Sequence, residues 1–443
     1  MPTSLVSCLR KQGITDPTPI QAATLPDSLA GRDVLGRGRT GSGKTYAFAL
    51  PVISRLQAST LQRKPRRPRA LILAPTRELA SQIATSIEPL ARAAHMRVLT
   101  VFGGVGKQGQ IRGLTSGVDV LIACPGRLED LLGSGDVTLD AIEITVLDEA
   151  DHMADLGFLP SVKRLLDRTP KGGQRMLFSA TLDRGIDVLV KRYLTNPVLH
   201  SADSPQSPVS TMEHHVLHIS RHDRLDILAD LTFGPGRSLV FSRTKRGAKR
   251  MAKQLNERGV HSVELHGDLA QNARTRNLNA FHSGQAPTLV ATDIAARGIH
   301  VDDVGLVIHA DPPEEHKAYL HRSGRTARAG ASGRVVTLMT DEQVRDVHAL
   351  TTKAGVTATT TRVRVGHPML RELAPRAEGS PAPVPVGSPT AETTSEHPRK
   401  APRSRRHPGQ RTGAQRTGGQ RSGGRRSRGQ RAGGQRQGRA RSS

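Results

Sequence analysis

The sequence feature that most constrains the fold is a glycine-rich segment at residues 38–45. It fits the pattern G-x-x-x-x-G-K-[ST] and follows a short apolar strand expected at about 33–36. Glycines at these positions let successive backbone N–H groups turn toward phosphate, and the following helix offers its positive N-terminus. Lys44 would neutralise the outer phosphates, and Thr45 would ligate Mg²⁺. The pattern predicts a strand–loop–helix unit that binds a nucleoside triphosphate with Mg²⁺, and a glycine-rich turn with a chance lysine is the alternative.

A run of acids predicts a second part of the same site. Residues 144–147 form a short β-branched apolar run, typical of a buried strand, and Asp148, Glu149 and Asp151 follow it. In open α/β sheets, ligands bind at the carboxyl ends of strands, so these acids are expected to face a crevice. The first carboxylate would hold Mg²⁺ through water, and the second could orient an attacking water. A solvated acidic turn is the alternative for these residues alone.

Two series of short apolar segments, separated by helix-forming stretches, predict an α/β fold with two parallel, doubly wound sheets. The expected strands lie at about 33–36, 70–74, 97–102, 118–123, 143–147 and 174–178, and then at 237–242, 260–265, 287–291, 304–309 and 333–339. The expected organisation is a first domain at 1–200, a linker at 201–213, a second domain at 214–365 and a tail at 366–443. The second series has no counterpart of the glycine-rich segment at 38–45, which we call the phosphate loop. One nucleotide site should therefore be completed by residues from both domains.

The predicted tail carries much of the positive charge. The net charge is +26, and residues 399–443 contain 15 Arg or Lys and no acid, which leaves 50 basic and 39 acidic residues elsewhere. A basic excess of this size points to nucleic acid or an anionic surface. Arginine recurs every five residues at Arg411, Arg416, Arg421, Arg426, Arg431, Arg436 and Arg441. A Pro/Ala then Arg/Gly/Gln-rich segment cannot bury apolar surface, so we expect a disordered tail that attracts RNA by charge, or a solubility appendage as the alternative.

The chain has few features of a secreted or membrane protein. Cys8 and Cys124 are too few for a disulfide framework or a zinc site, which favours a reducing compartment. Residues 1–10 lack the pattern of a signal peptide, and no apolar run approaches about 18 residues. We therefore expect a soluble, cytoplasmic protein without a membrane partner.

The second domain contains a basic segment, residues 321–328, that could complete the nucleotide site. Arg325 and Arg328 lie three residues apart, so on one helical face they could reach a γ-phosphate as arginine fingers. A solvated basic helix is the commoner explanation of such a segment alone. Four histidines at 214–222 are expected to alternate faces of a strand rather than bind a metal, and the basic loop 63–69 is expected to be a solvated connection.

Taken in order, these motifs resemble those of the DEAD-box ATP-dependent RNA helicases of superfamily two. The resemblance covers about residues 13–340, through segments 13–21 (the Q motif), 38–45, 75–79, 103–104, 125–127, 148–151, 179–181, 239–241, 271–274, 291–298, 311–312 and 321–328. It implies two tandem RecA-like domains. It also implies a nucleotide site that prefers ATP to GTP, because Gln21 would pair with adenine. It also implies an RNA-dependent ATPase that locally unwinds short RNA duplexes or remodels ribonucleoprotein.

The resemblance further implies roles for individual residues. ATP would be bound by Gln21, Gly38, Arg39, Thr40, Gly41, Ser42, Gly43, Lys44, Thr45, Asp293 and Gly298. Catalysis would use Lys44, Thr45, Asp148, Glu149, Arg325 and Arg328, with Mg²⁺ held by Thr45 and Asp148 largely through water. Nucleotide state would be coupled to RNA binding by Asp151, Ser179 and Thr181. The RNA sugar-phosphate backbone would be held by Thr76, Arg77, Gly104, Gly126, Arg127, Arg274 and Thr292, so binding should be independent of sequence.

Three departures from the family pattern stand out. The family's aromatic residue that stacks on adenine lies about 17 positions before the Q-motif glycine, whereas only twelve residues precede Gly13, so either the start codon lies further upstream or adenine is bound less tightly. Cys124 replaces the usual Thr before Pro-Gly-Arg, which is expected to cost one hydroxyl contact near RNA. His300 replaces the usual Asp, so a weaker contact with the ATP ribose is expected. We expect a monomeric motor whose partners include ribonucleoprotein or ribosome-assembly complexes. The alternative is a mainly non-catalytic RNA-binding or annealing protein, although such a protein has no need of Glu149 beside Asp148.

Overall fold

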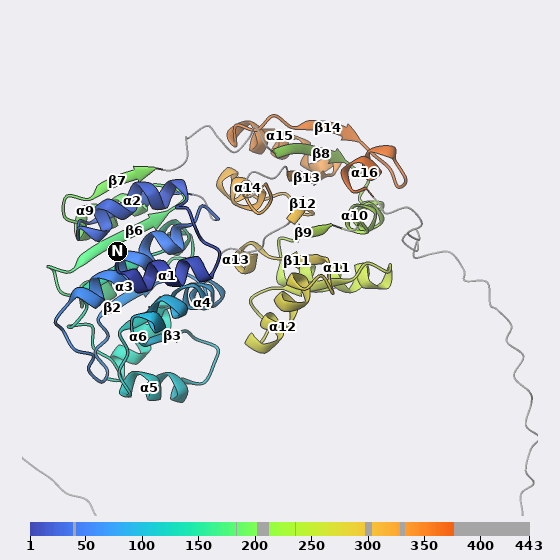
Figure 1. The fold of residues 1–443 in the computed structure, drawn as a ribbon. Coiled ribbons are helices and arrows are strands. Elements are labelled where there is room, and N and C mark those ends of the chain that lie inside the picture. The colour runs from blue at the N-terminus through green and yellow to red at the C-terminus, as the bar shows by residue number, and fades with distance from the viewer. Residues whose placement is uncertain are drawn as a thin grey trace, which may run out of the picture. The chain divides into compact units, whose positions relative to one another are not determined.

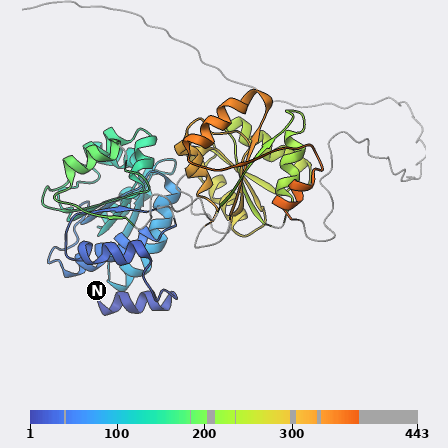
Figure 2. The same ribbon diagram turned by 90° about the horizontal axis from the view of Figure 1, so that it is seen from above.

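The computed structural model describes residues 1–38, 41–182, 184–201, 212–234, 236–296, 304–327 and 333–375 (Figure 1). The described chain contains two parallel sheets of seven strands each, with helices packed on them (Figures 1 and 2). The expected α/β class with two RecA-like parallel-sheet domains is therefore confirmed. The predicted tail beyond residue 375 lies outside the described residues.

The first sheet forms from seven short segments, most of them apolar. Its strands are β1 (Val34–Arg37), β2 (Ala70–Leu73), β3 (Val98–Val101), β4 (Val120–Ala123), β5 (Ile144–Leu147), β6 (Gln174–Ser179) and β7 (Val198–Ser201), in the spatial order β3-β4-β2-β5-β6-β1-β7. The central strands β2, β4 and β5 are buried along their whole length, as expected for continuous apolar runs in a parallel sheet. The edge strand β7 was missed from the sequence because its residues alternate between half-buried and exposed.

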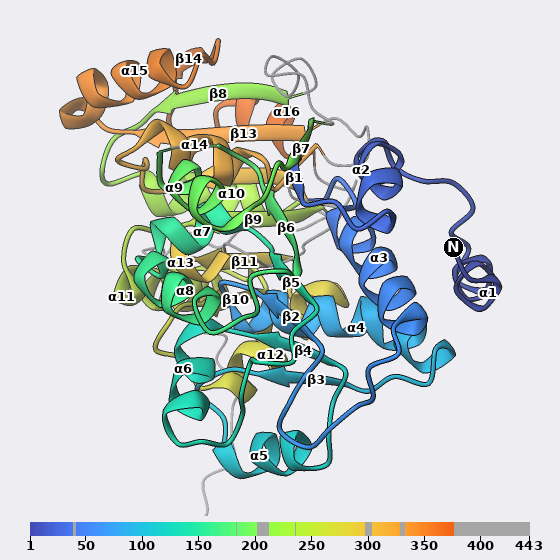
Figure 3. The ribbon, with the colours of Figure 1, turned by 90° about the vertical axis from the view of Figure 1, so that its left-hand side faces the viewer.

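Helices lie on both faces of this sheet. They are α1 (Thr3–Lys11), α2 (Pro19–Leu29), α3 (Lys44–Ala58), α4 (Arg77–Ala93), α5 (Lys107–Thr115), α6 (Pro125–Gly133), α7 (Ala150–Asp155), α8 (Leu159–Leu166) and α9 (Arg184–Tyr193). Figure 3 shows α3 and α4 on one side of the strands and α8 and α9 on the other. Two apolar clusters result, and the rings of Phe48 and Phe178, 5.5 Å apart, join α3 to β6 in one of them. Burying two such side chains stabilises the fold by roughly 1.5 to 3 kcal/mol each.

The second sheet repeats the arrangement. Its strands are β8 (Met212–His218), β9 (Arg237–Phe241), β10 (Ser262–Leu265), β11 (Thr288–Ala291), β12 (Val304–His309), β13 (Gly333–Met339) and β14 (Thr359–Arg362), in the order β10-β11-β9-β12-β13-β8-β14. Its helices are α10 (Arg224–Thr232), α11 (Lys245–Glu257), α12 (Gln271–His282), α13 (Asp293–Ala296), α14 (His316–Ser323), α15 (Val344–Lys353) and α16 (Pro368–Leu373), with a short 3₁₀ helix, η2, at Asp341–Gln343.

The second domain differs from the expectation at its two ends. Strand β8 already begins at Met212, inside the segment expected to be a linker. At the other end, α16 lies beyond the expected boundary at 365, and its Leu370 and Leu373 are buried in the same apolar cluster as α10. Two leucines three residues apart were too weak a periodic signal to predict this helix among prolines and charges.

The basic loop is exposed at residues 63–66, as expected of a solvated connection, and acids also hold it at three points. Arg63 donates to Asp119 at 2.7 Å, Arg67 to Asp140 at 2.8 Å, and Arg69 to Glu143 at 2.8 Å. Its two prolines limit the conformations of the backbone, which lowers the entropy cost of these contacts. The loop is therefore fixed against the amino end of the first sheet.

Candidate functional site

The glycine-rich segment lies where the sequence predicts it, between β1 and α3. Gly41 and Gly43 have φ values of 88° and 92°, the left-handed region that favours glycine. A Cβ atom at Gly43 would lie 2.6 Å from both the Gln21 amide nitrogen and the Thr18 hydroxyl, so a larger residue does not fit. This loop leads directly into α3, whose first residue is Lys44. Backbone N–H groups at such a helix N-terminus can bind phosphate.

The Lys44 side chain is folded back onto its own loop. Its Nζ donates to the Gly38 carbonyl oxygen at 2.7 Å, and the residue is only 6% exposed. An ammonium with one carbonyl partner retains two further donors. It can therefore bind phosphate oxygens at this loop, either in addition to the carbonyl or in its place.

Gln21 connects the segment before α2 to the phosphate loop. Its Oε1 accepts from the Thr18 backbone N–H at 3.0 Å, and its Nε2 donates to the Gly43 carbonyl oxygen at 2.9 Å. The first contact belongs to a capping box that begins α2. Gln21 is 5% exposed, so both ends of its amide serve the protein itself in this arrangement.

The acids after β5 are buried and have opposite protonation preferences. Burial raises the pKa of Asp148 to about 7, although the charge of Lys44 opposes this rise. Burial would also raise the pKa of Glu149, but a hydrogen bond from His152 and the charges of Lys44 and Arg325 hold that pKa below its ordinary value. Two neighbouring carboxyl groups with different pKa values are typical of functional sites in which each group has a different role.

The backbone and His152 fix the position of Glu149. Glu149 has a φ of 48°, unusual for a residue other than glycine, and it precedes the first residue of α7. Its Oε2 lies 3.3 Å from His152 Nδ1, one turn further along. His152 was not identified from the sequence, and the signal for it is its place three residues after Glu149, one turn along a helix.

Asp151 forms hydrogen bonds with Ser179 and with the segment after β6. These contacts bring together the three residues predicted to couple nucleotide state to RNA binding, Asp151, Ser179 and Thr181. Its Oδ2 accepts from the backbone N–H groups of Ala180 and Thr181 at 3.2 and 3.0 Å, and from the Thr181 hydroxyl at 3.1 Å. The Ser179 hydroxyl accepts from the Asp151 backbone N–H at 3.3 Å. A displacement of one segment would therefore pull on the other.

The predicted RNA residues of the first domain lie beyond the carboxyl ends of β2, β3 and β4. The Thr76 hydroxyl caps α4 by accepting from the Leu79 N–H at 3.2 Å. Gly104 has a φ of 77°, and a Cβ there would overlap the Arg77 guanidinium. Gly126 has open space at its Cα, near the N-terminus of α6. Arg127 donates to the Val105 carbonyl at 3.2 Å.

Side chains from the two domains meet next to these residues. Arg274 on α12 donates to Glu78 on α4 at 2.7 Å, and both residues are 8% exposed. Arg77 donates to the Gln271 side chain at 3.0 Å. The structure thus brings together Arg77 and Arg274, which the sequence pattern placed in one group. Glu78, which accepts from both Arg274 and Gln271, was missed although it lies within the motif at 75–79.

In the second domain, an arginine that was not singled out holds Asp293. Arg322 donates to both oxygens of Asp293 at 2.5 and 2.6 Å and to the Asp311 carbonyl oxygen at 2.7 Å. It also lies 5.0 Å from the centre of the Phe241 ring. Thr292 directly precedes α13 and is 7% exposed, and Arg325 is 6% exposed. Arg39, Thr40, Gly298, His300 and Arg328 lie outside the described residues.

These features define the class of tandem RecA-like proteins with a phosphate loop in the first domain. The family model described as DEAD/DEAH box helicase matches residues 18–189, and the helicase conserved C-terminal domain matches residues 223–330. No helix in the described part of the chain is long and apolar enough to cross a membrane.

Relatives and a solved structure agree with these matches. The ATP-dependent RNA helicase RhlB of Shigella dysenteriae is 40% identical over 357 residues, which cover 79% of this chain and 85% of the relative. The chloroplastic DEAD-box ATP-dependent RNA helicase 3B of Zea mays is 39% identical over 363 residues, 80% of this chain, which spans about half (48%) of that relative. The structure of Saccharomyces cerevisiae Dbp5 bound to RNA and ADP BeF3 has a TM-score of 0.72 at 26% identity, covering 82% of this chain and 94% of Dbp5. The chain belongs to the DEAD-box family of ATP-dependent RNA helicases.

Proposed function

We propose that this protein is an RNA-dependent ATPase that binds the RNA backbone and uses ATP hydrolysis to unwind short duplexes locally or remodel ribonucleoprotein. The observation that carries the proposal is the buried pair after β5. Glu149 is held ionised beside Asp148, and Asp148 shares its surroundings with Lys44 of the phosphate loop. A protein that only bound RNA would not need an ionised carboxylate on a residue with a strained backbone at this point.

The residues present fit ATP with Mg²⁺. Asp148 is a carboxyl group with 2% exposure whose Oδ1 accepts from the Glu149 N–H, so a cation at the site would stabilise its ionised form. Thr45 follows Lys44 at the start of α3, where its hydroxyl can provide a further oxygen ligand. When bound, Mg²⁺ would neutralise phosphate charge as it develops during transfer. Lys44 would bind the outer phosphates, supported by the backbone of residues 38–43.

Glu149 is the residue that we assign to the attacking water. Its lowered pKa keeps it ionised at neutral pH, so it can accept a hydrogen bond from water and orient that water toward phosphorus. His152 acts through Glu149, because its Nδ1 lies 3.3 Å from Oε2 and so fixes the orientation of the carboxylate. Arg325 and Arg328 would stabilise the negative charge of the transition state from the second domain, and Asp293 and Gly298 would complete the nucleotide contacts there.

Adenine recognition by Gln21 requires a rearrangement of the amide. Its Oε1 and Nε2 are the acceptor and donor that an adenine edge needs, but they now bind Thr18 and Gly43. An adenine that replaces the Gly43 contact would release the backbone of the phosphate loop. Base recognition and loop conformation would then be linked by this one side chain.

Coupling to RNA is assigned to Asp151, Ser179 and Thr181, because they join the end of β5 to the segment after β6. RNA itself would lie along Thr76, Arg77, Gly104, Gly126 and Arg127 of the first domain, and Arg274 and Thr292 of the second. Backbone N–H groups, hydroxyls and guanidinium groups contact phosphate and sugar without reading bases. These roles support sequence-independent binding, and we propose that the protein acts as a monomer.

The remaining parts of the proposal concern the cell. We propose a cytoplasmic location and ribonucleoprotein or ribosome-assembly partners, supported by the two free cysteines and by the excess of basic residues. The second candidate function is RNA binding or annealing without significant turnover.

Steady-state ATP hydrolysis with and without single-stranded RNA tests the proposal. We expect RNA to stimulate hydrolysis, and Glu149→Gln to remove the stimulated rate while ATP still binds. RNA binding without any stimulated hydrolysis would favour the second candidate function.

A further inference from the structure

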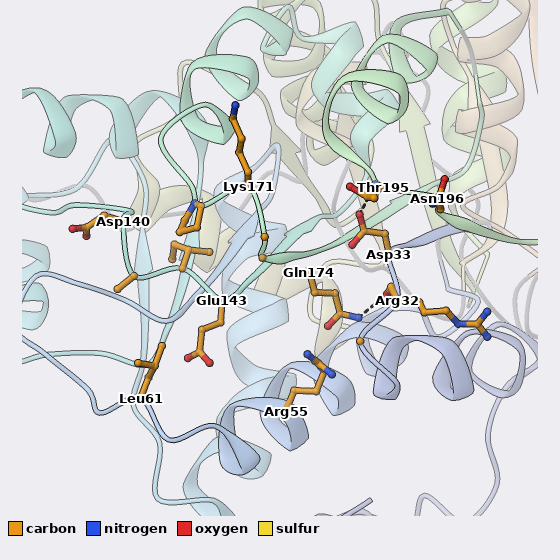
Figure 4. A pocket seen from close by; sticks show the side chains of 16 residues that line it. Arg32, Asp33, Arg55, Leu61, Asp140, Glu143, Lys171, Gln174, Thr195 and Asn196 are labelled. Carbon is orange, nitrogen blue, oxygen red and sulfur yellow. Dashed lines mark hydrogen bonds between the residues drawn. The ribbon is translucent and has the colours of Figure 1, made fainter.

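A cavity of about 720 Å³, here called the second cavity to distinguish it from the candidate nucleotide site, lies at the amino ends of the strands of the first sheet (Figure 4). It is lined by residues 31–33 before β1, 140–143 before β5, 170–174 at the start of β6 and 195–196 before β7, together with Arg55 and Leu61. The candidate nucleotide residues lie at the carboxyl ends of these strands. Four strand residues span about 13 Å, so the cavity is separate from that site. Its volume is in the range of pockets that bind small molecules.

The acids that line this cavity already have hydrogen-bond partners. Glu143 accepts from Arg69 at 2.8 Å, and Asp140 accepts from Arg67 at 3.1 and 2.8 Å. Asp33 accepts from the backbone N–H groups of Arg175 and Thr195, each at 2.7 Å. Glu143 and Asp140 are thus paired with arginine cations, and Asp33 accepts from two backbone N–H groups, so each of the three carboxylates has a partner.

Arg55, in contrast to these acids, has few hydrogen-bond partners. Within the described chain its Nη1 donates to the Leu29 carbonyl oxygen at 3.4 Å, and its Nε is buried without a hydrogen-bond partner. A guanidinium has five donors, so most of its capacity is unused. Gly31 makes room for it, because a Cβ there would lie 2.5 Å from Nη1, and its φ is 87°. Lys171, which is exposed on the rim, also has no acid partner among the described residues.

An unpartnered acceptor accompanies these cations. Gln174 is 5% exposed, and its Nε2 donates to the carbonyl oxygens of Ser28 and Arg32, both at 2.8 Å. Those two bonds fix the amide so that its Oε1, which has no hydrogen-bond partner, points toward the Arg55 guanidinium (Figure 4). Buried side-chain acceptors normally have a partner, so this oxygen marks a position for a ligand O–H or N–H.

We propose that this cavity binds an organic phosphate, with the phosphoryl group between Arg55 and Gln174. A singly protonated phosphate has oxygens that accept from the guanidinium and an O–H that can donate to the Gln174 carbonyl oxygen, whereas a carboxylate has only acceptors. Lys171 adds charge at the rim. Leu61, Ile142 and Pro170 form an apolar wall against which the organic part of the ligand packs. This binding site is additional to the proposed ATPase site and does not depend on it.

Calorimetric titration of the full chain with phenyl phosphate, inorganic phosphate and benzoate tests the proposal. We expect phenyl phosphate to bind most tightly, because it alone combines a phosphoryl group with an apolar ring. Hydrogen exchange should show new protection at 29–33 and 170–175. Arg55→Gln should weaken binding at least about tenfold, as expected for losing one charge-assisted hydrogen bond, and Arg55→Lys should restore part of it.

Two controls make the result decisive. Arg10→Gln removes the same charge from an exposed position on α1 and should leave the affinity for phenyl phosphate unchanged. Lys44→Ala removes phosphate binding at the glycine-rich loop and should leave binding at the second cavity intact. The proposal is overturned if no binding is detected, if benzoate or inorganic phosphate binds as tightly, or if binding is lost in Lys44→Ala and kept in Arg55→Gln. Thermal unfolding of Arg55→Gln and Arg55→Lys checks that both variants fold.

Discussion

Acid should destabilise the second domain through the buried His214. This residue is 5% exposed on β8, its Nδ1 lies 3.0 Å from the Tyr319 hydroxyl, and the two rings stack at 5.7 Å. Burial, with a smaller effect of His215, lowers the pKa of His214 from 6.5 to about 4. The folded domain therefore resists protonating a group that the unfolded chain protonates readily.

The sign and size follow from linkage. Above pH 6.5 the imidazole is neutral in both states, so it contributes no pH dependence. As the pH falls from 6.5 toward 4, only the unfolded chain takes up the proton, and the free energy of unfolding decreases. A shift of this size corresponds to about 3 kcal/mol in full, and to about 2 kcal/mol at pH 5. His309, whose pKa burial holds well below its ordinary value, adds to the loss, whereas Tyr319, with a pKa raised to about 12, does not titrate in this range.

Hydrogen exchange in β8 and β13 measures this effect locally, which matters because a two-domain chain need not unfold in a single step. After correction for the intrinsic exchange rate, protection should fall between pH 8 and pH 5. His214→Gln keeps a partner for the Tyr319 hydroxyl but cannot be protonated, so it should remove about 2 kcal/mol of that fall. The exposed His348→Gln should change nothing. An equal pH dependence in wild type and His214→Gln would refute the reasoning.

Three further predictions test the motor and the tail. Glu149→Gln should keep ATP and RNA binding and lower turnover at least about a hundredfold, whereas Lys44→Ala should weaken ATP binding itself; wild-type turnover in Glu149→Gln would contradict the role given to that residue. Hydrolysis measured with matched strands should respond to RNA far more than to DNA, because contacts to the ribose backbone distinguish the 2′-hydroxyl, and equal stimulation would indicate a DNA helicase. Deleting residues 399–443 removes 15 positive charges, and if four or five of them contact RNA, the slope of log affinity against log salt should fall by about 3. Turnover of that deletion variant at saturating RNA should stay near the wild-type plateau, and a collapsed plateau would place the tail in the catalytic state.

Local sequence patterns predicted the central strands because each lies in a continuous apolar run between turn signals. The phosphate loop was equally clear, since its glycines are required by backbone conformation, as the positive φ of Gly41 and Gly43 shows. The acids after β5 were placed correctly at the carboxyl end of that strand, because the apolar run before them marks where the strand ends. Each of these features depends on residues that are close together in the chain.

Features that depend on distant partners were not predictable in this way. Gln174 pairs with carbonyl oxygens about 140 positions earlier, and Arg322 reaches Asp293 from another helix. No local pattern distinguishes such buried polar residues from solvated ones. The basic loop at 63–69 shows the same limit, because its acid partners at 119, 140 and 143 are known only once the sheet has formed.

The double attachment of Gln21 has a consequence for attempts to change nucleotide specificity. A variant meant to accept guanine would alter the amide at residue 21, but the same change removes the cap on α2 and the contact with the Gly43 carbonyl oxygen. Loss of an N-terminal cap alone costs about 1 kcal/mol. Weaker ATP binding in such a variant would therefore combine a loosened loop with a lost base contact. Redesign of the base preference would have to begin at Thr18 and Gly43, by giving the loop another means of support, before the base-facing side chain is exchanged.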